Sequence, residues 1–320
     1  MEDAIWKNEL TVEARNRLIR IHHCKSAGWS LLFSFLKADP SLKILERFSP
    51  AELSSRFHLP IEKARHLHAE YHAVEIEELL TDFSKRGIQV RTVFDPDYPN
   101  LLKQIFRPPF VLYFRGDLSV LEMPVLSIVG SRNPTEYGRS VVRKLVPPLI
   151  EEGFAICSGL ARGIDREAHV QTMRAGGKTV AVLPGGFEQV YPPELGDLAE
   201  QIAARHLLLT EYPPHFPPKR PQFPERNRII AGLSWGTIVV EAARKSGSLI
   251  TARFALEAGR EVFAVPGPIT HPNSHGTNRL IQEGAKLVLD SGDISEELFP
   301  VLREKYRKPE ASIDKTGKYL

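Results

Sequence analysis

Residues 125–132 read VLSIVGSR, a short apolar run that ends at Gly130, Ser131 and Arg132. Similar runs follow along the chain: FAICSG, TVAVLPGG, HLLLTEY, TIVVEA, VFAVPG and KLVLD. Their apolar residues are continuous instead of alternating with polar ones, which is typical of parallel strands covered by helices on both faces. Because helical patterns separate the runs, the sequence predicts an α/β protein with an extended, Rossmann-like, doubly wound and mostly parallel sheet.

The N-terminal part of the chain has a different pattern. Over residues 1–86 the apolar side chains recur at helical spacing, and prolines interrupt the pattern repeatedly. In FSPAELSSRF, Ser49 is placed to cap a helix that begins at Pro50, with Glu52 three residues after the cap. We therefore expect a small all-α domain of short helices.

The rest of the chain divides into three segments. Residues 87–121 hold two strand-like runs, IQVRTVF and FVLYFRG, and are expected to be a connector that adds strands to the sheet. Residues 122–295 are the expected α/β domain, and residues 296–320 form a polar tail. A chain of 320 residues is longer than one core usually needs, which fits one large domain and a smaller one.

Composition indicates a folded protein without a disulfide or membrane signal. Hydrophobic residues make up 42% and charged residues 25%. Cys24 and Cys157 are too few for a disulfide framework or a zinc site, and no apolar run approaches the ~20 residues of a membrane span. His66, His68 and His72 do not share one helix face, so we expect no metal site. The two cysteines suit a reducing compartment, and we expect a cytoplasmic protein without a cofactor.

The net charge of +3 does not by itself indicate a nucleic-acid partner. Its distribution is more informative, because basic residues gather in the proline-rich stretch PPHFPPKRPQFPERNRIIAGLS, from Lys219 to Arg228. Its prolines favour an extended loop, and we expect a helix to begin near Arg226. Phe223 beside these arginines is either a core residue or a platform on which a nucleobase stacks.

The strand ends indicate where a ligand binds. In doubly wound sheets, ligands bind at the carboxyl ends of the strands, near the switch point in strand order. Glycine lets an anion approach the backbone, and the following helix start supplies free N–H groups. These glycines could instead only make tight turns, but several on one rim favour an anion site, and Arg132 adds a planar charged group.

A second motif, SGLARGID, contributes Arg162 and Asp165 just after the next strand. We expect Asp165 to cap the following helix or to orient an arginine, because no second carboxylate or histidine at useful spacing makes it a base. The sequence has no P-loop, no dinucleotide fingerprint and no nucleophile elbow. We therefore expect binding without catalysis. The alternative is a Rossmann-like nucleoside-phosphate hydrolase with Glu241 as its acid, although PGGFEQVYPPE lacks the Gly-Thr pair expected after the double glycine.

The motifs SIVGSR, SGLARGIDREAH, TVAVLPGG, FPERNRIIAGLS, EAARKSGSLITARFALEAGREVFAVPG and GTNRLIQEGAKLV, taken together and in this order, resemble the DprA/Smf family of DNA-processing proteins. The resemblance is dense over about Val125–Asp290, and the N-terminal helical region resembles that family's SAM-like domain more loosely. Many members add a C-terminal winged-helix domain, for which the polar tail offers no matching sequence.

This resemblance implies a homodimeric protein that binds single-stranded DNA during natural transformation, protects it and helps to load the recombinase RecA past single-strand-binding protein. It implies no catalytic residues. The resemblance places the DNA contacts, with Lys219 aligned more loosely than the others, on Gly130, Ser131, Arg132, Ser158, Gly159, Arg162, Gly185, Gly186, Lys219, Phe223, Arg226 and Asn227.

Overall fold

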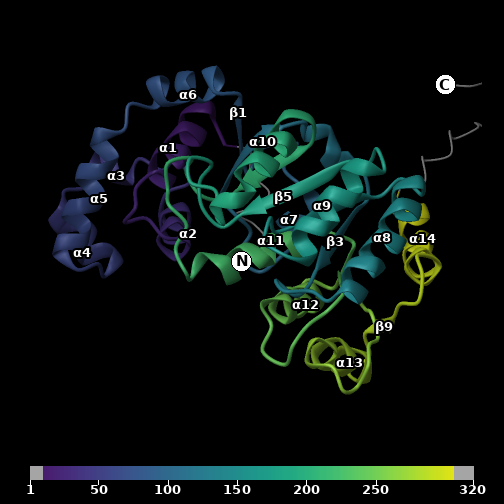
Figure 1. Ribbon diagram of the computed structural model, residues 1–320. Helices are drawn as coiled ribbons and strands as arrows, with labels where there is room; N and C mark the ends of the chain where they lie inside the picture. Colours follow the sequence, from purple (N-terminus) through teal and green to yellow (C-terminus); the bar gives the residue numbers. More distant parts are fainter. Residues whose placement is uncertain (1–9, 306–320) are drawn as a thin grey trace, which may run out of the picture.

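The apolar runs of the sequence are the strands of one sheet in the computed structural model, which describes residues 10–305 (Figure 1). The strands are β1 Ile88–Thr92, β2 Val111–Gly116, β3 Val125–Val129, β4 Ala155–Ser158, β5 Thr179–Leu183, β6 Leu207–Thr210, β7 Gly236–Val239, β8 Glu261–Ala264 and β9 Lys286–Leu287. The helices are α1 Val12–His22, α2 Trp29–Ala38, α3 Ile44–Arg47, α4 Pro50–Phe57, α5 Ile61–Ala73, α6 Ile76–Lys85, α7 Asn100–Lys103, α8 Glu136–Glu151, α9 Ile164–Arg174, α10 Gly196–Arg205, α11 Gln222–Leu233, α12 Gly247–Glu257, α13 His275–Gln282 and α14 Gly292–Lys305.

The strand order is β1-β2-β6-β5-β4-β3-β7-β8-β9. Strands β3 to β9 pair in parallel, while β2 pairs antiparallel with both β1 and β6. The predicted doubly wound, mostly parallel sheet is thus confirmed, and the two connector strands extend one of its edges. Because β4 and β7 flank β3, the strand order reverses there. Doubly wound sheets have their ligand crevice at such a switch point, which here lies at the carboxyl ends of β3 and β7.

Strand β3 shows why the apolar runs are continuous. Leu126 and Ile128 pack with α8, α9 and α14, whereas Val125 and Val129 belong to the apolar cluster of the other face. Every residue of β3 is buried. Both faces of the strand are covered, so neither face selects polar side chains.

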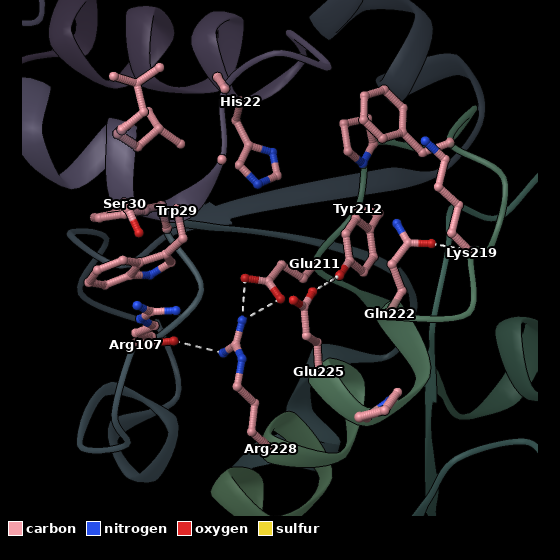
Figure 2. Close-up of a pocket in the computed structure, with 18 of the residues that line it drawn as sticks. His22, Trp29, Ser30, Arg107, Glu211, Tyr212, Lys219, Gln222, Glu225 and Arg228 are labelled. Atoms are coloured by element: carbon pink, nitrogen blue, oxygen red, sulfur yellow. Dashed lines mark hydrogen bonds and ion pairs between the residues drawn. The ribbon is translucent and has the colours of Figure 1, made fainter. Parts of the chain in front are cut away.

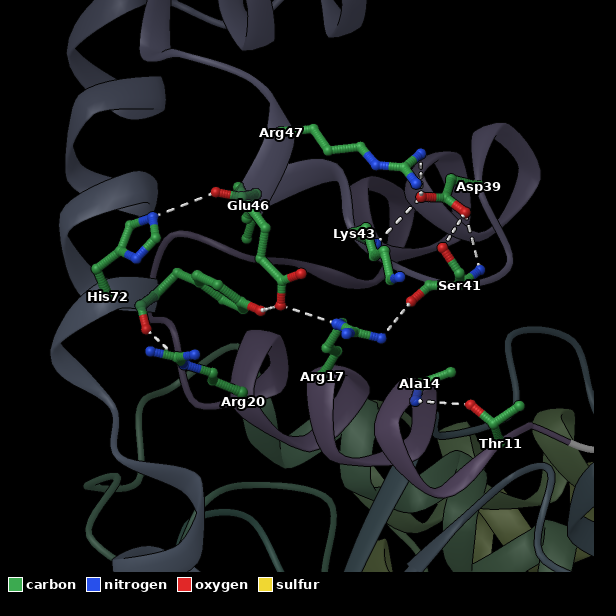
Figure 3. Close-up of polar contacts among 12 residues, drawn as sticks. Thr11, Ala14, Arg17, Arg20, Asp39, Ser41, Lys43, Glu46, Arg47 and His72 are labelled. Carbon is green, nitrogen blue, oxygen red and sulfur yellow. Dashed lines mark hydrogen bonds and ion pairs between the residues drawn. The ribbon is translucent and has the colours of Figure 1, made fainter.

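The helical region, α1 to α6, is drawn in purple and blue in Figure 1. Helix α4 begins at Pro50 as predicted, with Ser49 and Glu52 forming both bonds of a capping box. Glu46 of α3 accepts from Arg17 Nε of α1 at 2.8 Å (Figure 3). It also accepts from the Tyr71 hydroxyl of α5 at 2.9 Å, so it joins three helices.

The helical region and the sheet share one apolar core. Leu18 and Ile21 of α1 belong to the same buried cluster as Leu112 of β2. At the edge of this cluster, Arg15 Nε donates to Asp95 at 2.9 Å, and its Nη2 donates to the Val90 carbonyl at 2.9 Å. The helices are therefore packed against the sheet edge and are not tethered to it by a linker alone.

Two boundaries differ from the sequence-based expectation. Helix α11 begins at Gln222, so the expected start near Arg226 is wrong by about one turn. Pro224 lies in the first helical turn, where a backbone N–H would have no partner within the helix, so proline is tolerated there. At the C-terminal end, α14 continues through the expected start of the tail at residue 296 as far as Lys305. Residues 306–320 of that predicted tail lie outside the described residues.

Two features of composition are also visible. Cys24 and Cys157 are both free and buried. Within residues 10–305, no helix combines the length and the apolar character needed to cross a membrane.

Candidate functional site

The loop after β3 lies at the switch point and is held by its neighbours. The carbonyl of Ser131 accepts from the Ile164 N–H of α9 at 3.1 Å. The side-chain amide of Asn273 donates to the carbonyl of Asn133 at 3.1 Å. Strand ends and helix starts thus fix the backbone on both sides of Arg132, whose side chain is exposed.

Arg132 and Phe223 face each other across the crevice. The guanidinium carbon of Arg132 lies 6.0 Å from the centroid of the half-buried Phe223 ring. The Tyr191 ring meets Phe223 edge-on, with centroids 5.4 Å apart and planes at 84°. No acidic side chain among residues 10–305 forms an ion pair with Arg132, so its charge remains available to a ligand. The structure thus brings these two candidate site residues together.

Arg226 occupies a different kind of position, because only 4% of it is exposed. Its Nη1 donates to the carbonyls of Gly159 and Val182, at the ends of β4 and β5. Burial lowers the pKa of Arg226 to about 10, and the nearby Asp165 opposes that shift. In this arrangement Arg226 Nη1 holds the ends of β4 and β5, and contact of Arg226 with a ligand stays a prediction.

Asp165 lies buried in the first turn of α9. Burial raises the pKa of Asp165, while the charge of Arg226 and backbone donors at Gly159 and Ala161 act in the opposite direction. That Asp165 orients an arginine stays a prediction. The N-cap of α9 is Gly163, so Asp165 is not the capping residue itself.

Several predicted glycines are packing positions in this structure. A Cβ atom on Gly186 would lie 2.1 Å from the carbonyl oxygen of Pro214, and one on Gly159 would lie 2.7 Å from the Arg226 guanidinium. The N–H of Gly186 donates to the Phe216 carbonyl at 2.7 Å. Gly185 and Gly186 are therefore covered by the proline-rich loop, and their contact with a ligand stays a prediction.

The other predicted residues are distributed around the rim. Ser158 is buried, and its hydroxyl donates to the Ile128 carbonyl at 2.6 Å. Arg162 is exposed and paired with Glu194, which is also exposed. The half-buried Asn227 donates to the Gly247 carbonyl at 3.3 Å. The half-buried Gly130 packs against Ile164 of α9.

Sequence reasoning missed two basic residues near the switch point. Arg244 and Lys245 are exposed in the loop between β7 and α12, which begins at the carboxyl end of β7. The signal was present, because ARKSG directly follows the apolar run TIVVE. Lys219, in contrast, is exposed on the proline-rich loop but lines a separate cleft.

Glu241 has a structural position. Its two carboxylate oxygens accept from the Thr135 N–H at 2.9 Å and from the Thr135 hydroxyl at 2.6 Å. Thr135 is also the N-cap of α8. Both oxygens thus hold the start of α8, which does not favour the hydrolase alternative.

Metal-binding side chains do not gather in the described part of the chain. Across residues 10–305, no three or more His, Cys, Asp and Glu side chains come together as a metal site would require. His68 and His72 share a face of α5, with ring centroids 4.4 Å apart.

Comparison with known proteins identifies the family. The family model described as DNA recombination-mediator protein A matches residues 89–299. A DNA processing protein DprA of Bacillus subtilis (strain 168) is 42% identical over 282 residues, covering 88% of this chain and 93% of the relative. The chain belongs to this DprA/Smf family. The assignment made from six ordered motifs is confirmed.

Two solved structures of DprA proteins are similar to this one. The X-ray structure of DprA from Streptococcus pneumoniae has a TM-score of 0.77 and 34% identity, covering 91% of this chain and 99% of that chain. A DprA structure from Helicobacter pylori, whose subject is its single-stranded DNA binding mode, has a TM-score of 0.60 and 31% identity. It covers 67% of this chain and 97% of that chain.

Proposed function

We propose that this protein binds single-stranded DNA, without sequence preference, at the crevice beside β3. The observation that carries the proposal is the exposed Arg132 guanidinium above the Phe223 ring, with no acidic partner among the described residues. A nucleobase can stack on the ring while its phosphate binds the guanidinium. Neither contact reads a base edge, so affinity is expected to be independent of sequence.

Relatives support this proposal. The Helicobacter pylori DprA structure, 31% identical, concerns single-stranded DNA binding. The family description names a mediator of DNA recombination. We infer from family membership that the bound strand is protected and passed to RecA in place of single-strand-binding protein during natural transformation, and that the protein acts as a homodimer.

The DNA-binding proposal is tested by two substitutions in the crevice. Phe223→Ala is expected to weaken binding to oligo-dT by about 5- to 150-fold, because one stacked base contributes about 1–3 kcal/mol. Arg132→Gln should weaken binding as well and reduce the salt slope of log K by about 0.7, the value for one lost phosphate contact on a single strand. Fluorescence anisotropy at several salt concentrations measures both effects.

The control is Arg303→Gln, which removes an exposed positive charge on α14. This change should leave the oligo-dT affinity close to that of the unaltered protein. Wild-type affinity and salt slope in both crevice variants would refute the proposed site.

Transfer to RecA and dimer formation need separate measurements. We expect the protein to speed RecA assembly on a strand coated with single-strand-binding protein, and to have the mass of a dimer in light scattering. Equal assembly rates with and without the protein would refute the loading role, whatever the DNA affinity.

A further inference from the structure

A cleft of about 780 Å³ lies between the helical region and the start of α11 (Figure 2). The proposed crevice does not include it. One wall comes from the helical region, with Lys25, Trp29 and Lys63, and another comes from the proline-rich loop and α11, with Lys219 and Gln222. The turn at Phe106 and Arg107, between α7 and β2, completes the lining.

The turn at Phe106 and Arg107 is unusual in both side chain and backbone. Phe106 is 79% exposed, and Arg107 has a φ of +55°, a conformation that L-residues rarely adopt. Figure 2 shows how the turn is held: Arg228 Nη1 donates to the Arg107 carbonyl at 2.7 Å, and its Nη2 pairs with both oxygens of Glu211. Glu211, which is buried, thus orients the arginine that holds the turn. Residues in such rare backbone conformations are often found at ligand-binding sites.

The rings around this turn form a stacking surface. The Arg107 guanidinium carbon lies 5.5 Å from the Trp29 ring centroid and 5.2 Å from that of Phe106. Trp29 is fixed because its Nε1 donates to the Pro108 carbonyl at 2.8 Å. Exposed aromatic rings and guanidinium planes are the groups on which unpaired bases stack.

The charges of the cleft favour an anionic ligand. Its acidic side chains already have partners: Glu211 binds Arg228, Glu225 accepts from the Tyr212 hydroxyl at 2.8 Å, and Glu257 pairs with Arg253 at 3.4 Å. The exposed cations that form no ion pair with an acidic residue of the described chain are Lys25, Lys63, Arg107 and Lys219. The cleft thus combines apolar rings with available positive charge.

The first turn of α11 connects the cleft with the crevice. Gln222 lines the cleft, while the next residue, Phe223, faces Arg132 on the other side. Gln222 also accepts from the Lys219 N–H, which holds the end of the proline-rich loop against the helix start. A strand that leaves Phe223 therefore needs to cross only this turn to enter the cleft.

We propose that the cleft is a second subsite for the same DNA strand, in which an unpaired base stacks at Phe106 and its phosphates meet Arg107 and the cleft lysines. This inference rests on the proposed function. The crevice contacts a short segment of the strand, and the cleft contacts further nucleotides of the same strand. Affinity should therefore continue to rise when the strand is longer than the segment that the crevice alone contacts.

The test measures oligo-dT affinity against length, from about 4 to about 16 nucleotides, for the full chain and for a Phe106→Ala, Arg107→Gln double variant. The variant should bind the shortest strands like wild type but reach its plateau at a shorter length. For the longest strands its affinity should be about 5- to 150-fold lower. Its salt slope should be smaller by about 0.7 for the longest strands only.

The controls separate the possible failures. Arg303→Gln should follow wild type at every length, and thermal melting should show that the double variant is folded, since both side chains are exposed. If wild type binds no strand, the proposed function fails. If wild type binds and the double variant has the same length profile, or weakens equally at all lengths, the cleft is not a separate subsite. A further control adds free dTMP at a concentration that saturates the cleft. If the dependence of oligo-dT affinity on strand length then stays unchanged, the strand does not use the cleft, and the inference is overturned.

Discussion

At the scale of single residues, two arginines with similar sequence signals have different environments. Arg132 is exposed above an aromatic ring, whereas Arg226 is 4% exposed and bound to two backbone carbonyls. Binding should therefore depend on Arg132 through contact, and on Arg226 through the shape of the rim.

Arg226→Met tests this difference. The substitution leaves Asp165 without its nearby cation and the carbonyls of Gly159 and Val182 without a donor. Loss of one partner of a buried charge typically costs about 3–5 kcal/mol of unfolding free energy. Arg132→Gln should change that free energy by no more than about 0.5 kcal/mol.

Urea unfolding followed by circular dichroism measures both values. An Arg226→Met protein as stable as wild type but unable to bind oligo-dT would instead make Arg226 a direct contact. The sequence could not separate these roles, because the burial of Arg226 depends on the proline-rich loop and the ends of two strands that lie far away in the chain.

At the scale of elements, the proline-rich loop that leads to α11 packs directly on the double glycine. The carbonyls of Pro213 and Pro214 would lie 2.3 Å and 2.1 Å from a Cβ atom on Gly186. Since these atoms belong to the backbone, they cannot yield as a flexible side chain can. A methyl group on Gly186 must displace the loop that leads to Phe223.

Gly186→Ala should therefore weaken oligo-dT binding by about tenfold or more, equivalent to about 1.4 kcal/mol, although Gly186 itself is buried. Gly196→Ala is a matched control, because Gly196 begins α10 with helical backbone angles and a Cβ atom there would meet no other atom within 4 Å. Titration by anisotropy compares the two. Equal oligo-dT affinities of the two variants would show that displacement of the proline-rich loop does not move Phe223 away from its binding position.

The elements themselves were largely predictable. Strands β3 to β8 coincide with continuous apolar runs, since burial on both faces leaves a simple pattern in the sequence. The capping box at Ser49 likewise depends on residues within one turn. The start of α11 could not be predicted, because the prolines as far as Pro224 favour an extended loop. The cleft could not be predicted either, because its walls come from segments that pack together only in the folded protein.

At the scale of the whole molecule, histidines lie where the helical region meets the sheet. His22 Nδ1 is 3.1 Å from the Tyr113 hydroxyl of β2, and the buried His23 packs against Phe83, Tyr113 and His215. Burial lowers the pKa of His22 to about 3 and that of His23 to about 4. The junction is therefore built around neutral imidazoles.

Stability should fall as the pH decreases through the unfolded histidine value of 6.5 toward 4. The unfolded chain binds protons in this range that the folded chain does not, so stability is fully present above 6.5 and is lost below it. Each such histidine contributes a slope of about 1.4 kcal/mol per pH unit. Urea unfolding between about pH 8 and about pH 5.5, where carboxylates with ordinary pKa values stay ionised, should show this slope.

His23→Asn cannot gain a charge and should reduce this slope by about 1.4 kcal/mol per pH unit, even if the variant is less stable at every pH. His66→Asn, on the exposed side of α5, is the control and should keep the wild-type slope. An unchanged slope in His23→Asn would assign the pH dependence to other groups.

The apolar core that runs without interruption from α1 into the sheet has a mechanical consequence. Ile105, next to Phe106, and Ile229 of α11 both belong to this core, so a change in the distance between Phe223 and Phe106 would open the core to water. A bound strand must then adapt its own backbone to this fixed distance. The number of nucleotides between the base at Phe223 and the base at Phe106 should therefore be the same for every strand.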